Sequence, residues 1–194
     1  TQTEMAAYYS AGELTLGLGS MVEAFGHTAC ESLACGTPTL GARVGVHRSQ
    51  LPDDLLEKVD YGDTKAAAAA AARILREHVR VEGEQLERIR DIFSLERQLE
   101  AYERIISAAE KQPFPESIPL RIDKDSLFAL APWCYLSARG IFNDYHARYY
   151  QIPALQNLLE RSSLITPEER ERSGISFHAV MEWYQLGLLV PVRD

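Results

Sequence analysis

The stretch GHTACESLACGTPTLGAR, residues 26–43, predicts one helix followed at once by one strand. In its first part, apolar residues recur at helical spacing and form one face. These residues are Ala29, Cys30, Leu33 and Ala34. Its second part, residues 37–43, is a short apolar run after Gly36, which is typical of a buried strand. A helix joined directly to a buried strand is the repeating unit of an α/β layer.

The flanking residues extend this layer on both sides. The predicted elements are a helix over 3–12, a short buried strand over 13–19, a brief strand near 57–59 and helices over 64–78, 82–93 and 94–112. Asp63 and Ser94 are placed to cap the helices that follow them. Residues 1–62 supply about three strands, whereas a parallel sheet usually has five or more. We therefore expect an α/β fold that contains the second half of a Rossmann-like parallel sheet, within a longer chain.

Composition narrows the class of protein. The 194 residues are 46% hydrophobic, with a formal net charge of −8. This charge disfavours a general DNA or anionic-membrane surface, since both need clustered Lys and Arg. The three cysteines, Cys30, Cys35 and Cys134, lack a C-x-x-C pair, which favours a reduced cytoplasmic setting over a disulfide scaffold and predicts no metal site. No apolar run has the length of a membrane-spanning helix.

A proline-rich change of composition at residues 111–125 predicts a domain boundary. We expect a first domain over 1–112 and a second, small, mainly helical domain over 113–194. Residues 132–163 are predicted to form two or three helices. Residues 166–194 are predicted to form a helix, a turn, a second helix and a short strand, which would suit a winged-helix-like domain.

The segment EAFGHTACE, residues 23–31, carries the candidate site. If the helix begins at Gly26, its N–H groups and dipole point toward the carboxyl edge of the preceding strand, where α/β proteins bind phosphates. Thr28 could add a hydroxyl donor, and Glu31 could accept both hydroxyls of a ribose. Glu23 could meet a sugar beyond the phosphates. The alternative is that both glutamates are solvated surface charges.

A longer string favours the binding interpretation. The motifs are YYSAGELTLGLGS, EAFGHTACE, ESLACGTPTLGA and RVGV, from Tyr8 to about Gly45, with FSLERQLEAYERI further on. Together they resemble the carboxyl-terminal domain of family-4 (group 1) retaining glycosyltransferases, which have the GT-B architecture. The resemblance covers roughly residues 5–108. It departs from the family pattern at Ala24 and Val46, where glycines are usual.

The resemblance implies a role for each motif residue. Glu31 would hold the ribose of a UDP- or GDP-linked sugar, and Glu23 would act at the donor sugar near its anomeric carbon. Backbone N–H groups would face the sugar and the diphosphate; they belong to Ala24, Phe25 and Gly26. Thr28 would assist, and His27 could reach a phosphate. No metal or other cofactor is implied.

The resemblance also implies missing parts. The family's phosphate-binding Arg and Lys and its acceptor domain precede this point, so we expect a donor-binding portion that needs an upstream segment or an amino-terminal domain for activity. The alternative is an inactive glycosyltransferase-like module that acts as a scaffold. Residues 164–194 resemble the helix-turn-helix of MerR-like regulators more loosely. Their second helix has no Lys or Arg, so a protein partner is favoured over DNA.

Overall fold

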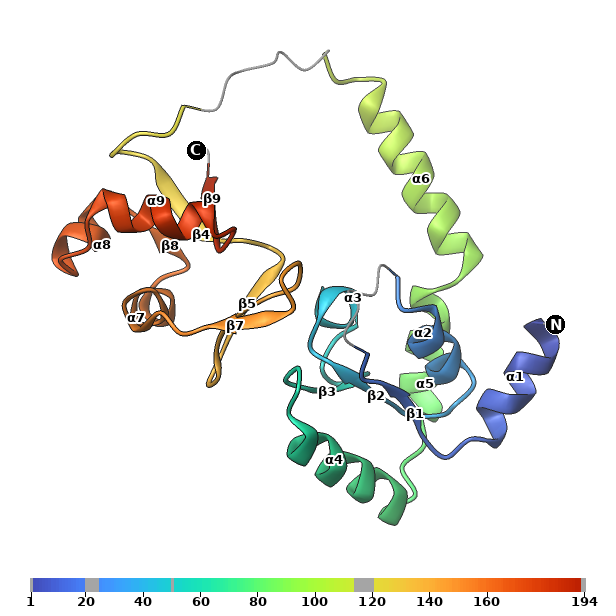
Figure 1. Ribbon diagram of the computed structural model, residues 1–194. Coiled ribbons are helices and arrows are strands. Elements are labelled where there is room, and N and C mark those ends of the chain that lie inside the picture. Colours follow the sequence, from blue (N-terminus) through green and yellow to red (C-terminus); the bar gives the residue numbers. More distant parts are fainter. Residues whose placement is uncertain (1, 20–24, 50, 114–120, 193–194) are drawn as a thin grey trace. The chain divides into compact units, whose positions relative to one another are not determined.

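The computed structural model divides the chain into two compact units, Thr1–Glu116 and Ser117–Asp194 (Figure 1). The sequence analysis placed the boundary between residues 112 and 113. The structure describes residues 2–19, 25–49, 51–113 and 121–192.

The first unit contains a parallel sheet of three strands, as predicted. The strands are β1 (Thr15–Gly17), β2 (Thr39–Ala42) and β3 (Glu57–Val59), in the spatial order β1-β2-β3. Strands that lie in the order of the sequence form one side of a doubly wound sheet, in which the other half extends from the first strand. The α/β fold class is thus confirmed, and the sheet has the order expected for a second half.

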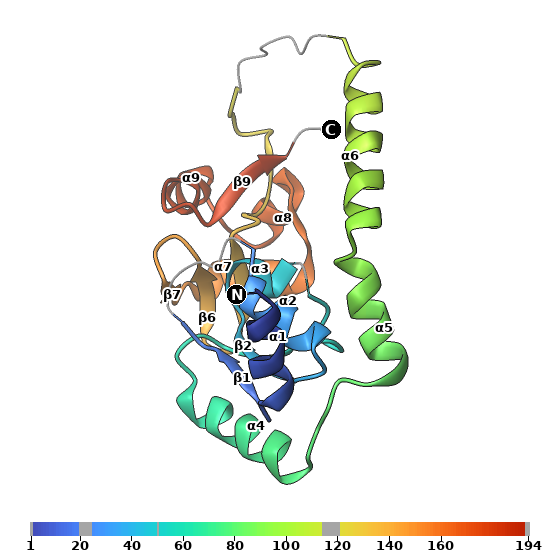
Figure 2. The ribbon, with the colours of Figure 1, turned by 90° about the vertical axis from the view of Figure 1, so that its right-hand side faces the viewer.

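Helices cover both faces of this sheet. The described helices of the first unit are α1 (Gln2–Ala11), α2 (His27–Ala34), α3 (Gly45–Ser49), α4 (Thr64–Arg76), α5 (Gly83–Ile92) and α6 (Leu95–Ala109). Helix α4 lies on one side of the sheet, and α2 and α5 lie on the other (Figures 1 and 2). The predicted caps are confirmed: Asp63 accepts a hydrogen bond from the Ala66 N–H, and Ser94 accepts one from the Arg97 N–H.

Two apolar cores follow from this layering. On the α4 side, Leu40 of β2 packs with Ala70 and Ile74. On the other side, Leu33 of α2 and Ile89 of α5 belong to one buried cluster. The alternation of side chains along β2 sends Leu40 to the α4 side, so Gly41 faces the opposite side, where the candidate site lies.

Strand β1 differs from the prediction of a buried strand. Its Leu16 side chain is 58% exposed, and Leu18, just beyond the strand, is also exposed. Among the described residues, β1 pairs with β2 alone and therefore forms an edge of the sheet. Tyr8 of the neighbouring α1 is exposed as well.

Helix α6 also presents apolar side chains to solvent. None of its residues is buried, and the exposed apolar ones are Leu95, Leu99, Tyr102, Ile105 and Ile106. None of the helices in the described part of the chain is long and apolar enough to cross a membrane.

The thiol of Cys30 gives a test of the packing between α2 and α5. Cys30 is buried, and this burial, with a smaller effect of the Glu31 carboxylate, raises the pKa of its thiol to about 11. Because the folded thiol keeps its proton above the ordinary pKa of 9.0, folding stability should fall as the pH rises from about 9 to 11.

We expect Cys30 to react slowly with a disulfide reagent at pH 8, because the thiolate is the reactive form. The measurement compares a variant that retains Cys30 alone with one that retains the less buried Cys35 alone. Cys30 should react only after denaturation. Equal rates for the two native variants would contradict the packing described for α2.

The second unit contains two antiparallel sheets. One has the order β8-β4-β9 and the other the order β5-β6-β7. The strands are β4 (Leu127–Leu130), β5 (Cys134–Ser137), β6 (Gly140–Asn143), β7 (Arg148–Tyr150), β8 (Leu164–Ile165) and β9 (Leu189–Val192). The helices are α7 (Pro153–Arg161), α8 (Pro167–Arg172) and α9 (Phe177–Gln185).

The prediction of two or three helices over residues 132–163 is wrong for most of that range. The structure has the meander β5-β6-β7 there, followed by the single helix α7. The helix, turn, helix and short strand predicted over 166–194 are present as α8, α9 and β9, with Thr166 and Ser176 as side-chain caps.

The second unit has its own core, to which sheets and helices both contribute. Phe128 of β4, Leu155 of α7 and Val180 of α9 belong to one buried cluster. A backbone carbonyl also ties the meander to the turn after α9. The Gly187 oxygen accepts hydrogen bonds from the indole of Trp133, at 2.7 Å, and from the amide of Asn143, at 3.1 Å.

Candidate functional site

A pocket of about 200 Å³ opens where β1 ends and α2 begins. It is lined by Leu16, Gly17, Gly19, Gly26, Thr28, Ala29, Thr39, Val44 and His47. The carboxyl edge of a parallel sheet is where α/β folds bind their ligands. Two of the predicted site residues, Gly26 and Thr28, lie in this pocket.

Gly26 occupies the N-cap position of α2 in a left-handed conformation, with φ 76° and ψ 36°. A side chain there would be strained, and its Cβ would lie 3.1 Å from a methyl group of Val46 and 3.4 Å from the His47 ring. Because glycine has no side chain, it cannot cap the N–H groups of the first turn. The amino end of α2 can therefore approach an anion closely.

His47 was not among the predicted site residues. It lies on the short helix α3 and is only 6% exposed. Its Nδ1 atom is 3.3 Å from the carbonyl oxygen of Ala42. A Cβ on Gly17 would lie 3.0 Å from its Cε1, and one on Gly41 would lie 3.2 Å from its Nδ1. Glycines on β1 and β2 thus make room for one buried imidazole.

This close packing predicts a double-mutant result. Gly17→Ala should lower the free energy of unfolding of the first unit by about 1–3 kcal/mol, because the new methyl group collides with His47. In a His47→Ala background the same change should cost much less. The measurement is urea unfolding followed by far-ultraviolet circular dichroism.

Gly19→Ala is the matched control, since no atom of the described residues lies within 4 Å of its added Cβ. Its effect should stay within about 0.5 kcal/mol. A cost of Gly17→Ala that is the same with and without His47 would show that the collision described here does not occur.

Thr39 contributes a second polar group that the sequence analysis did not single out. Its side chain is 2% exposed, and its Oγ1 atom has no hydrogen-bond partner within the described residues. A buried hydroxyl without a partner costs about 1–3 kcal/mol. Its burial follows from the register, in which Thr39 pairs with Thr15 beneath α2.

Thr28 and Glu31 lie on the side of α2 that faces α1. Both side chains reach the hydroxyl of Tyr9, and burial, followed by the hydrogen bond and charge of Glu31, raises the pKa of that phenol. Thr28 lines the pocket, whereas Glu31 lies one helical turn further and does not. Glu31, the residue predicted to bind the ribose, thus lies beside the pocket and contacts the hydroxyl of Tyr9.

The other predicted site residues either do not line the pocket or lie outside the described residues. The rings of Phe25 and His27 lie 4.4 Å apart, and Phe25 also contacts Phe93 beyond α5. The structure thus brings these two side chains to each other and not into the pocket lining. Glu23 and Ala24 lie outside the described residues.

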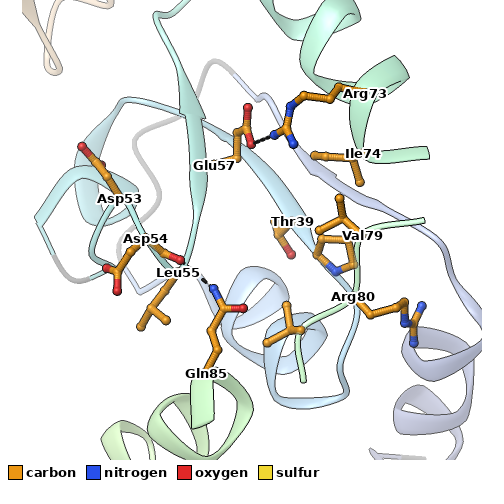
Figure 3. Close-up of a pocket in the computed structure, with 12 residues that line it drawn as sticks. Thr39, Asp53, Asp54, Leu55, Glu57, Arg73, Ile74, Val79, Arg80 and Gln85 are labelled. Carbon is orange, nitrogen blue, oxygen red and sulfur yellow. Dashed lines mark hydrogen bonds and ion pairs between the residues drawn. The ribbon is translucent and has the colours of Figure 1, made fainter. Parts of the chain in front are cut away.

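A second pocket, of about 210 Å³, lies at the opposite edge of the sheet (Figure 3). Thr39 lines this pocket as well as the first, and several of its other polar and charged groups are already engaged with the protein. Arg73 pairs with Glu57, Gln85 donates a hydrogen bond to the carbonyl of Asp54, and Arg80 donates one to the carbonyl of Gly12. The carboxyl-edge pocket is therefore the better candidate. No group of three metal-binding side chains occurs among the residues that the structure describes.

The chain is similar to sucrose-phosphate synthase from Thermosynechococcus elongatus, with 32% sequence identity and a TM-score of 0.45. The match covers 55% of this chain and 28% of the synthase, so it spans less than a third of that protein. No protein-family model matches the chain, and no curated protein matches it at a significant level.

Proposed function

We propose that the first unit is the donor-binding part of a retaining glycosyltransferase and binds a nucleotide sugar at the carboxyl edge of β1 and β2. One observation carries this proposal. The left-handed Gly26, Thr28 and Thr39 line one pocket at the amino end of α2, and the Thr39 hydroxyl has no hydrogen-bond partner within the described residues. That combination supports binding of a phosphorylated ligand, and the motif string from Tyr8 to Gly45 supports a diphosphate-linked sugar.

Each residue has a distinct role in this proposal. The amino end of α2 stabilises the diphosphate, including the negative charge that develops on it as the sugar leaves. Thr28 donates a hydrogen bond to a phosphate oxygen, and the buried Thr39 hydroxyl gains a partner in the bound ligand. Glu31 accepts the ribose hydroxyls and exchanges its contact with Tyr9 for them. Glu23 acts at the donor sugar.

Turnover in this proposal requires a further segment or domain that binds the acceptor. The exposed edge of β1 supports such a partner, because an edge strand presents unpaired N–H and C=O groups to another strand. The exposed Leu16 belongs to that edge strand and would be covered by the partner. The second unit is proposed to bind a protein partner.

Nucleotide binding separates this function from the alternative of an inactive scaffold. We expect UDP or GDP to give a saturable heat in calorimetric titration of the whole chain. Thr28→Val should weaken this binding about 10- to 100-fold, because the loss of one hydrogen bond to a charged group costs about 1.5–3 kcal/mol. Thr64→Val, on the exposed start of α4, is the matched control and should leave the affinity unchanged.

The absence of a saturable heat for both nucleotides would favour the scaffold. Equal weakening by the two threonine variants would show that the nucleotide does not bind at the amino end of α2.

A further inference from the structure

The second unit buries a positive charge without an opposite one. Arg170 on α8 is 5% exposed, and within the described residues it forms no ion pair with a carboxylate. One of its terminal nitrogens donates a hydrogen bond to the carbonyl of Lys124. Its Nε atom is buried and has no hydrogen-bond partner in the described part of the chain. A buried guanidinium normally has an anionic partner, because desolvation of an unpaired charge is costly.

The nearby protein groups compensate this charge only in part. The guanidinium lies over the ring of Phe177, with its carbon 5.4 Å from the ring centroid, so it gains a cation–π contact. Arg170 also attracts the carboxylate of Glu168, but that side chain is fully exposed and interacts first with Thr166. The adjacent Arg172 pairs with Glu169, at 2.8 Å.

Arg170 lines a pocket of about 250 Å³ within the second unit. Three apolar residues form part of its wall, namely Pro167, Ile175 and Phe177. Three charged residues complete the lining: Lys124, Asp125 and Glu171. The pocket is therefore lined by a buried cation and by an apolar surface, and the Nε–H donor of that cation is unsatisfied within the described residues.

These charges distinguish between anions. The guanidinium has the planar fork that matches a carboxylate. The two carboxylates in the lining, Asp125 and Glu171, would repel a phosphate dianion more than a single negative charge. The apolar wall would contact a hydrocarbon body next to the anionic group.

We propose that this pocket binds a carboxylate with an apolar body, with the carboxylate on Arg170. The ligand is a small organic acid or the carboxyl terminus of an apolar peptide, since both present the same chemistry. This inference concerns the second unit alone and does not depend on nucleotide binding by the first.

The test follows the Arg170 Nε–H resonance by NMR in the whole ¹⁵N-labelled chain. Titration with 4-methylpentanoate should move this resonance saturably, because the carboxylate gives the N–H an acceptor. The neutral 4-methylpentanamide and inorganic phosphate should each bind at least tenfold more weakly. Tighter binding of N-acetyl-leucine than of 4-methylpentanoate would identify the peptide terminus as the source of the carboxylate; the reverse order would identify the free acid.

Two variants keep the test decisive. Arg170→Lys retains the charge but lacks Nε, and it should weaken binding of 4-methylpentanoate at least tenfold. Because this buried change could affect folding, Glu171→Gln provides a second measurement: it should tighten binding about two- to threefold by removing a like charge.

Three results would overturn the proposal. The first is the lack of a saturable shift with 4-methylpentanoate. The second is equal binding of the amide or of phosphate. The third concerns Glu171→Gln in the absence of ligand. If this change alone shifts the Nε–H resonance as much as 4-methylpentanoate does, Glu171 itself is the partner of Arg170.

Discussion

Gly140→Ala is expected to unfold or severely destabilise the second unit, with a loss of about 3 kcal/mol or more. Gly140 begins β6 with φ 113°, a conformation that residues with a side chain rarely adopt. An added Cβ would lie 2.6 Å from the carbonyl oxygen of Tyr150 and 2.9 Å from Nε2 of Gln151. The first of these atoms belongs to the backbone of the neighbouring strand, so it can move only if the meander is distorted.

Tryptophan fluorescence during urea unfolding measures this effect in the second unit alone, because both tryptophans of the chain, Trp133 and Trp183, lie there. Gly174→Ala is the matched control. Gly174 also has a positive φ, 66°, but nothing in the described part of the chain lies within 4 Å of an added Cβ, so only the conformational cost of about 1–2 kcal/mol applies. Equal losses for the two variants would contradict the close contact between β6 and β7.

Glu31→Gln is expected to weaken the binding of UDP or GDP about 10- to 100-fold. The change keeps the size of the side chain but removes its charge, and hydrogen bonds to a charged group contribute about 1.5–3 kcal/mol. Calorimetric titration of the whole chain gives the dissociation constants. The result would test whether the ribose hydroxyls reach a side chain that lies one turn beyond the pocket.

Two control variants separate ligand contact from indirect effects. Tyr9→Phe removes the protein partner of Glu31 and leaves its carboxylate in place, so the affinity should be retained or should rise. Glu13→Gln removes an exposed charge that precedes the amino end of β1, and it should have no effect. A loss with Tyr9→Phe equal to that with Glu31→Gln would indicate that Glu31 acts by holding α1 against α2.

The first unit could be predicted from the sequence because its signals are local. Apolar residues at helical spacing, such as Ala29 and Leu33, identify α2, and the cap residues Asp63 and Ser94 fix where two later helices begin. The exposure of β1 could not be predicted, since Leu16 has the same apolar character whether or not another strand covers it. Whether Leu16 is buried depends on what lies against β1, and the sequence of the strand itself does not contain that information.

The meander of the second unit was missed for a different reason. Residues 132–163 were predicted to be helical, but their aromatic residues alternate along the strands. Tyr135, Phe142 and Tyr149 lie in register on one face, while Ile141 and Tyr150 pair on the other. The period of two was present in the sequence, and the hairpin turn before Gly140 marked its first reversal.

The residues of the candidate site also differ in whether a local sequence pattern could predict them. Gly26 and Thr28 could be predicted, because a helix start after a strand is a local pattern. His47 could not, because its place in the pocket depends on glycines that lie next to each other only in the folded sheet, and Thr39 could not, because its burial depends on its pairing with Thr15. The pairing of Gly17 with Gly41 brings those glycines together beneath the imidazole.

Mapping amide chemical shifts while UDP and GDP are added to the ¹⁵N-labelled chain tests the central claim most directly. The largest saturable shifts are expected at Gly26, His27 and Thr28, with smaller ones at Gly17. Shifts concentrated instead around the opposite edge of the sheet, near Asp54 and Glu57, or no saturable shifts at all, would contradict it.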